Sequence, residues 1–121
     1  MRPRLLPLAL IAALAVVALA GAGTASAATC NVRPSDYPGD GYFTSLRVTG
    51  VSCSTGKSVA REHYRKRVRR GGRDGKYNGS VKGYSCRESN RRKTTRPREL
   101  NARVTCRRGG KRIVFTYQQN L

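Results

Sequence analysis

The four cysteines limit the possible folds of this chain more than any other feature. They stand at Cys30, Cys53, Cys86 and Cys106. No two of them have the Cys-x-x-Cys spacing that is typical of a zinc site. In a short exported chain, four cysteines are typical of two disulfides, and each disulfide contributes about 2–4 kcal/mol to the stability of a small domain. We therefore expect two disulfides and no metal site.

The first 27 residues have the pattern of a secretory signal peptide. Arg2 and Arg4 precede an apolar run over residues 5–20, and a small-residue Ala-Ser-Ala segment ends at Ala27. The run is shorter than the ~20 apolar residues that a membrane-spanning helix needs, so an uncleaved membrane anchor is the weaker alternative. We expect cleavage after Ala27 and secretion of a mature chain without a transmembrane segment.

The chain that follows this leader has the size of one small domain. It comprises 94 of the 121 residues, a length at which a modest hydrophobic core often needs covalent links. Residues 28–41 contain two prolines and two glycines, and we expect them to form an irregular N-terminal arm. We expect residues 42–121 to fold as a single domain and the protein to be a monomer.

Alternation of apolar and polar residues predicts four strands. The strands cover residues 42–51, 81–86, 102–106 and 113–117. Gly109-Gly110 separates the last two, and paired glycines are typical of a tight hairpin. Two polar segments between strands are predicted as loops, and the second, arginine-rich loop is predicted to be mobile. These loops cover residues 71–80 and 87–100.

One helix is predicted between Cys53 and Gly71-Gly72. Ser54 is the predicted N-cap, and the two glycines are predicted to end the helix. A narrow apolar stripe recurs every four residues along it: Gly56, Ala60, Tyr64 and Val68. A separate row of basic residues is expected to face the solvent: Arg61, Arg65 and Arg69.

The order β-α-β-β-β predicts an α+β domain in which one helix packs on a small antiparallel sheet. If the strands over residues 81–86 and 102–106 are neighbours, Cys86 and Cys106 lie about five residues, or ~16 Å, apart in register. A disulfide does not reach over that distance. We therefore disfavour a bond between Cys86 and Cys106 and leave the two alternative pairings open.

Residues 50–59, GVSCSTGKSV, differ by one residue from a phosphate-binding loop. Such a loop has four residues between its first glycine and Gly-Lys, whereas five residues separate Gly50 from Gly56. Cys53 is also expected in a disulfide. The stretch therefore indicates a strand end, a disulfide anchor and a helix start, and we expect no bound cofactor.

Three short motifs resemble those of small secreted actinobacterial proteins of unknown function. The motifs are Gly50-Val51-Ser52-Cys53, Gly83-Tyr84-Ser85-Cys86 and Cys106-Arg107-Arg108-Gly109. The resemblance extends over residues 42–117 and implies a signal peptide and a disulfide-linked domain, but no activity. The arginine-rich residues 87–100 depart from the pattern.

The sequence offers little that is typical of catalysis. His63 is the sole histidine, and therefore the sole ready general base near neutral pH. Its helix neighbours Arg61 and Glu62 do not converge with it, because adjacent helical residues do not face each other. We expect His63 to be a packing residue and the protein not to be an enzyme. A small secreted nuclease is the weaker alternative.

Basic residues dominate the charge of the chain. It has 25 Lys and Arg against six Asp and Glu, a net charge of +19, and only Arg2 and Arg4 lie in the leader. A field of this kind attracts polyanions and accelerates their association. High-GC coding sequences also enrich proteins in arginine, and the two explanations carry equal weight.

The leading hypothesis is binding to anionic surfaces or polymers, such as cell-wall polymers, lipid headgroups or nucleic acid. The expected contacts are basic residues of the helix and the second loop: Arg61, Arg65, Arg69, Arg91, Arg92, Lys93, Arg96 and Arg98. The alternative is a protein-interaction or protease-inhibitor-like module that presents residues 71–80 or 87–100 as an ordered loop. A membrane-active peptide ranks lower, because the helix lacks a broad apolar face.

Overall fold

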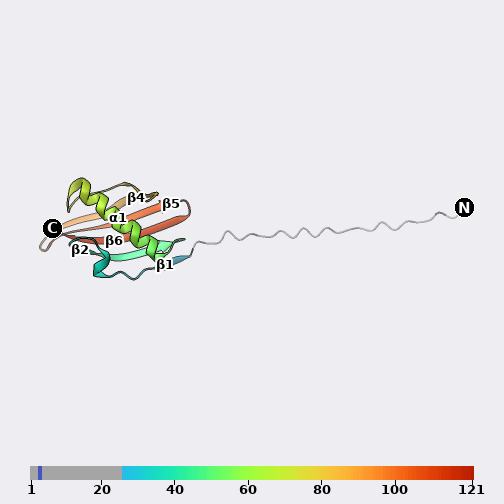
Figure 1. Ribbon diagram of the computed structural model, residues 1–121, viewed down its shortest axis with the longest axis horizontal. Helices are drawn as coiled ribbons and strands as arrows, with labels where there is room; N and C mark the ends of the chain where they lie inside the picture. Colours follow the sequence, from blue (N-terminus) through green and yellow to red (C-terminus); the bar gives the residue numbers. More distant parts are fainter. Residues whose placement is uncertain (1–2, 4–25) are drawn as a thin grey trace.

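One helix lies across one face of a six-stranded antiparallel sheet (Figure 1). The computed structural model describes Pro3 and residues 26–121, so nearly all of the predicted leader, residues 1–27, lies outside the described residues. The elements are β1 (Ala27–Thr29), the 3-10 helix η1 (Pro34–Asp36), β2 (Gly41–Thr49), α1 (Cys53–Gly71), β3 (Gly79–Val81), β4 (Tyr84–Thr95), β5 (Arg98–Arg108) and β6 (Lys111–Asn120).

The strands follow the order β1-β2-β6-β5-β4-β3 across the sheet. The α+β fold predicted from the sequence is therefore confirmed, with two short edge strands, β1 and β3, added to the predicted four. The Gly109-Gly110 hairpin between β5 and β6 is confirmed as well. Among the described residues, α1 and η1 include no stretch that is both long and apolar enough to cross a membrane.

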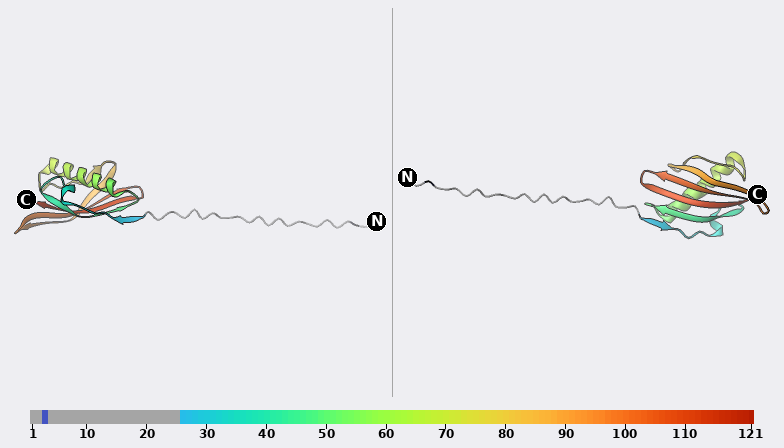
Figure 2. Two further views of the ribbon diagram at one scale, coloured as in Figure 1. Left: turned by 60° about the horizontal axis from the view of Figure 1, so that its bottom comes forward. Right: turned by 180° about the vertical axis from the view of Figure 1, so that it is seen from behind.

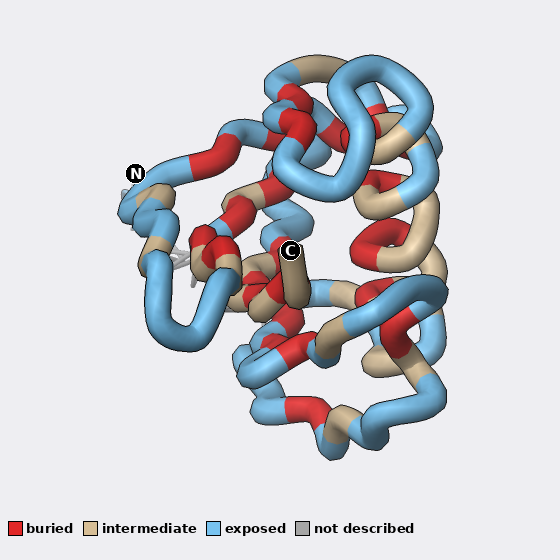
Figure 3. Tube along the Cα trace, turned by 90° about the vertical axis from the view of Figure 1, so that its left-hand side faces the viewer, coloured by how far each residue is buried: buried red, intermediate tan, exposed pale blue. Residues whose placement is uncertain are grey.

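The hydrophobic core lies between α1 and the sheet, where the buried residues of both layers meet (Figure 3). Alternate residues of the central strands point into it, including Leu46 and Val48 of β2 and Phe115 of β6. Gly56 allows α1 to approach the sheet closely, because a Cβ atom at this position would lie 2.6 Å from Cγ1 of Val48.

The helix begins two residues earlier than its predicted N-cap, Ser54, implies. Ser52 is the N-cap, and its Oγ accepts a hydrogen bond of 3.1 Å from the backbone N–H of Thr55. Ser54 lies exposed within the first turn. Gly72, with φ +75°, caps the C-terminal end as predicted for the glycine pair.

The buried stripe of α1 also differs from the predicted one. It consists of Gly56, Val59, Ala60, His63 and Arg67, whereas Val68 is only half-buried. A strict four-residue repeat rotates by about 40° at each step around a helix of 3.6 residues per turn. The stripe therefore drifts away from the sheet by position 68, and Arg67 takes the inward position.

Residues 87–100, predicted as a mobile loop, form most of a long β-hairpin. β4 runs to Thr95, β5 starts at Arg98, and the exposed turn lies at Arg96-Pro97. The prediction was wrong because this part of the hairpin has few apolar residues, although its backbone pairs with its neighbour. Residues 81–86, predicted as one strand, are likewise a hairpin that turns at Lys82-Gly83.

Two disulfides link the chain, as expected from the four cysteines. Cys30 bonds to Cys53 and Cys86 bonds to Cys106, with Cα–Cα distances of 5.5 and 4.0 Å. The expectation against the Cys86–Cys106 bond was wrong. Because β4 and β5 extend to a common turn, Cys86 lies directly opposite Cys106 in the ladder instead of five residues away.

Candidate anion-binding surface

Figure 2 (right) shows the face of the sheet that α1 leaves uncovered. The residues that point to this face include many arginines. Successive residues of a strand point to opposite faces. In β5, Leu100, Ala102 and Val104 are buried under the helix, so the residues between them point to the uncovered side. We call the six exposed arginines on this side the basic sheet face: Arg47, Arg87, Arg92, Arg103, Arg107 and Arg112.

Strand register places these arginines close together although they come from four strands. Arg107 of β5 lies directly opposite Arg112 of β6, and Arg47 of β2 lies opposite Val114, two residues further along β6. With strands ~4.8 Å apart and ~6.7 Å between alternate residues, the Cα atoms of neighbouring arginines are about 5–12 Å apart. The face therefore presents a lattice of guanidinium groups.

The Arg107–Arg112 pair is unfavourable within the isolated domain. Like charges directly opposite each other in an antiparallel pair destabilise the sheet. The next pair toward the turn, Arg108 and Lys111, repeats the same conflict. An anion bound between two such side chains relieves their repulsion.

Two hollows lie on the basic sheet face. One, of about 250 Å³, is lined by Arg47, Arg103 and Arg112 around Val114. The other, of about 540 Å³, lies along β4 and β5. Its lining residues are Ser85, Arg87, Glu88, Ser89, Thr105 and Arg107. Guanidinium groups and hydroxyls are donors that suit phosphate oxygens.

In the described part of the chain, no carboxylate forms an ion pair with the arginines of this face. Among residues 26–121, the ion pairs involve four other basic residues: Lys57, Arg65, Arg91 and Lys93. Glu99 points to the same side of β5 as Arg103, but its carboxylate accepts hydrogen bonds from the Gln118 and Asn101 side chains, at 2.6 and 3.4 Å. In the described part of the chain, the six arginines have no acidic partner within 4.0 Å.

The structure separates the basic residues that the sequence grouped together. Arg61, Arg65 and Arg69 lie on the outer side of α1, across the domain from the basic sheet face. Arg65 pairs with Glu62 at 3.3 Å. A second acid, Asp36, lies in the hollow that Arg61 and Arg65 help to line. This side of the molecule therefore carries compensating negative charge.

The five basic candidate residues of the predicted second loop lie in three places: the basic sheet face, the surroundings of residues 74–75, and the hairpin tip. Arg92 lies opposite Asn101 and belongs to the basic sheet face. Arg91 is half-buried and donates to backbone oxygens of the 74–75 segment and to Glu88. Lys93 pairs with Asp74 at 2.8 Å, which lowers the pKa of that carboxyl group. The hairpin tip carries Arg96 and Arg98.

Sequence reasoning missed five of the six arginines of this face. Alternation along the predicted strands was a usable signal, because it set Arg47 and Arg103 opposite to the buried positions of their strands. It did not show that four strands bring their outward residues together. The β2–β6 pairing, which joins distant segments, creates that alignment.

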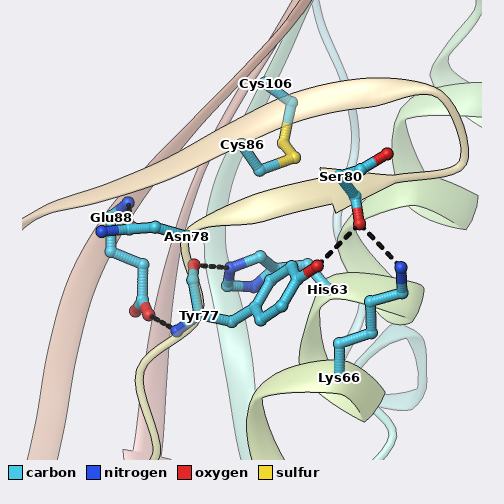
Figure 4. The surroundings of a disulfide bond; sticks show 8 residues. All are labelled: His63, Lys66, Tyr77, Asn78, Ser80, Cys86, Glu88 and Cys106. Atoms are coloured by element: carbon cyan, nitrogen blue, oxygen red, sulfur yellow. Dashed lines mark hydrogen bonds between the residues drawn. A yellow bond between two sulfur atoms is a disulfide. The ribbon is translucent and has the colours of Figure 1, made fainter.

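His63 is buried, with 1% of its surface exposed, and packs against the ring of Tyr77 near the Cys86–Cys106 disulfide (Figure 4). Its Nε2 atom donates to the Tyr77 carbonyl oxygen at 3.0 Å. Burial lowers the pKa of His63, and the hydrogen bond to the carbonyl partly opposes this shift. In this arrangement the imidazole does not face solvent.

Tyr77 ties the loop before β3 to its surroundings (Figure 4). Its backbone N–H donates to the Glu88 carboxylate at 2.6 Å, and its hydroxyl donates to the Ser80 carbonyl oxygen at 2.9 Å. Lys66 of α1 donates to the same Ser80 oxygen at 2.7 Å. Residues 26–121 contain no cluster of three or more potential metal ligands.

Arg67 is a buried cation whose two terminal guanidinium nitrogens find acceptors within the protein, whereas its Nε atom has no hydrogen-bond partner among the described residues. Only 1% of its surface is exposed. Its guanidinium donates to the carbonyl oxygen of Arg73 and the hydroxyl of Tyr37, both at 2.7 Å, and to Oε1 of Gln119 at 3.1 Å. It also stacks 4.4 Å from the ring centre of Tyr117. These contacts fix the end of α1, and they leave Arg67 inaccessible to a ligand.

Comparison of the chain with models of protein families, with curated proteins and with solved structures found no significant match. The architecture is that of a small α+β domain with two disulfides and an arginine-rich sheet face.

Proposed function

We propose that this protein is a secreted, non-enzymatic module that binds anionic polymers. The observation that carries the proposal is the set of six exposed arginines on one sheet face, without a carboxylate partner in the described part of the chain. The two disulfides of this small domain are compatible with an extracellular location.

The uneven distribution of charge supports the proposal. The outer side of α1 carries arginines together with Glu62 and Asp36, whereas the six arginines of the sheet face have no acid bonded to them. A predominantly basic face attracts a polyanion and increases its association rate.

Salt dependence tests this function. The protein recovered from the medium of cells that express the full chain is applied to immobilised heparin, with neutral dextran as the control resin. If six arginines each displace a condensed counterion, affinity should fall by about 10³ between ~50 and ~200 mM salt. Retention that does not change with salt, or no retention at ~50 mM salt, would refute the proposal.

A second candidate function is a protein-interaction or inhibitor-like module. The observation that favours it is the ordered β4–β5 hairpin, whose exposed tip is held by a 2.6 Å hydrogen bond from the Thr94 hydroxyl to the Pro97 carbonyl oxygen. Incubation with trypsin-like proteases tests it. An inhibitor stays intact and blocks the protease, whereas a merely basic hairpin is cleaved within residues 91–98 and leaves the protease active.

A further inference from the structure

We infer that the basic sheet face binds one extended, base-free phosphodiester chain along β4 and β5, with one phosphate for every two strand residues. The inference rests on the proposed function and makes it specific, because it names the strands, the spacing and the polymer class. The polymer class is a poly(alditol phosphate) with six backbone bonds between successive phosphorus atoms.

Four arginines form a zigzag row along the β4–β5 ladder, which we call the arginine row: Arg107, Arg87, Arg103 and Arg92. Register sets Arg87 opposite Thr105, which lies between Arg103 and Arg107 on β5. Arg92 lies opposite Asn101, the next outward position of β5. The row therefore alternates between the two strands and advances by two residues at each step.

The step of this row matches the repeat of the polymer. Two strand residues advance by ~6.7 Å, and one lateral strand spacing of ~4.8 Å makes the distance between successive arginine Cα atoms about 8 Å. A fully extended chain covers about 3.3–3.6 Å with three backbone bonds. A six-bond phosphodiester repeat therefore covers about 7 Å, so successive phosphates meet successive arginines.

The surroundings of the row provide the remaining contacts. The hollow of about 540 Å³ lies beside two arginines of the row, Arg87 and Arg107. Its other lining residues are Ser85, Ser89 and Thr105, which carry hydroxyls, and the largely buried Glu88. These hydroxyls suit both phosphate oxygens and the free hydroxyls of an alditol. At the end of the row, Arg107 lies opposite Arg112, so a phosphate there is shared by two guanidinium groups that otherwise repel each other.

The same face favours a polymer without bases. Binding of single-stranded nucleic acid typically uses aromatic side chains on which bases stack. The outward positions of β4 and β5 are arginine, serine, threonine, asparagine and glutamate, without an aromatic residue. Tyr42 is an exposed aromatic residue on β2, outside the row.

The experiment measures binding of fluorescently labelled poly(glycerol phosphate) to the secreted, oxidised protein over a series of salt concentrations. The row variant carries Arg87→Gln, Arg103→Gln and Arg107→Gln. The matched control loses the same charge on the outer side of α1, through three substitutions: Arg61→Gln, Arg65→Gln and Arg69→Gln. The row variant should bind about 100-fold more weakly and lower the slope of log affinity against log salt by about 2, whereas the control should change the slope by less than about 0.5.

Two ligand pairs test the polymer class. An abasic 12-residue deoxyribose phosphate oligomer and oligo(dT) of equal length should bind equally, since both have six-bond repeats and the face does not stack bases. Tighter binding of oligo(dT) would overturn the base-free assignment. Poly(glycerol phosphate) should bind more tightly than inorganic polyphosphate of equal charge, and the reverse order, or preference for anionic vesicles, would overturn the spacing argument.

Failure of this inference differs from failure of the proposed function. If the wild-type protein binds with steep salt dependence but both triple variants bind alike, the arginine row is wrong and polyanion binding stands. If the wild type binds none of the polymers at ~20 mM salt, both are wrong.

Each variant is checked for intact disulfides and an unchanged unfolding midpoint. If the triple row variant does not fold, Arg103→Gln alone replaces it, with an expected slope change of about 0.7.

Discussion

Removal of either disulfide should destabilise the domain strongly. The bonds close segments with sequence separations of 23 and 20 residues. Loop-closure entropy for segments of this size gives about 3 kcal/mol for each bond. Cys86 and Cys106 are both 0% exposed, so replacing them with alanine also removes two buried sulfur atoms. The loss of each buried sulfur atom costs about 1 kcal/mol, so removal of the Cys86–Cys106 bond should lower the free energy of unfolding by about 5 kcal/mol in total.

Urea unfolding followed by circular dichroism measures the effect on the oxidised protein and on two paired alanine variants. The Cys30→Ala/Cys53→Ala variant should lose about 3–4 kcal/mol, because Cys53 is only half-buried and its replacement removes less buried surface. A loss of about 3 kcal/mol corresponds to a melting temperature at least ~12 °C lower in a domain of this size. Dithiothreitol that leaves the melting curve of the wild type unmoved would refute the reasoning, as would free thiols in the secreted protein.

Three further predictions concern α1 and its contact with the sheet. Because burial lowers the pKa of His63, the unfolded state takes up a proton near pH 6.5 that the folded state does not. The free energy of unfolding should therefore be highest above about pH 7 and should fall as the pH drops below about 6.5. His63→Phe should flatten this part of the pH profile of the urea midpoint. Gly56→Ala should cost about 1–3 kcal/mol in urea unfolding, because its Cβ meets a valine methyl at 2.6 Å, whereas Gly110→Ala, with open space around it, should be nearly neutral. Ser52→Ala should cost about 1 kcal/mol through loss of the N-cap, and an equal cost for Ser54→Ala would contradict the assigned helix start.

Local patterns predicted the parts of the fold that depend on neighbouring residues. Gly109-Gly110 marked a tight turn, because glycine adopts the positive φ of +56° that Gly109 shows. The alternation of Ile113, Phe115 and Tyr117 marked a strand with one buried face. Gly71-Gly72 predicted the helix end, because glycine also adopts the positive φ that Gly72 shows at the C-cap.

The segment over residues 87–100 was mispredicted because its strand character depends on a partner. Its side chains have few apolar contacts to make, and sequence patterns detect strands through burial. The pairing with β5 instead holds it through backbone hydrogen bonds and, at its base, through the Cys86–Cys106 bond. The same error moved the two cysteines apart in the predicted register.

The inward position of Arg67 shows a second limit of sequence patterns. A charged residue is normally assigned to the solvent side of a helix, because burial of an isolated charge is costly. Here the acceptors come from three separate segments, two of them distant in sequence: Tyr37 before β2, Arg73 just after α1 and Gln119 in β6. The tertiary fold assembles these partners, so the sequence of α1 alone does not reveal them.

The candidate surface and the disulfides are physically connected. Arg107 and Arg112 lie opposite each other in the ladder position next to the pair of Cys106 and Ile113. Repulsion between the two arginines favours separation of β5 from β6 at this end, whereas burial of Ile113 opposes it, and the Cys86–Cys106 bond links β5 to β4 on its other side. A small domain without covalent links would have little stability to offset such repulsion. The two disulfides therefore help the domain to tolerate this lattice of arginines, and under the proposed function a phosphate bound between Arg107 and Arg112 would stabilise the fold further at this position.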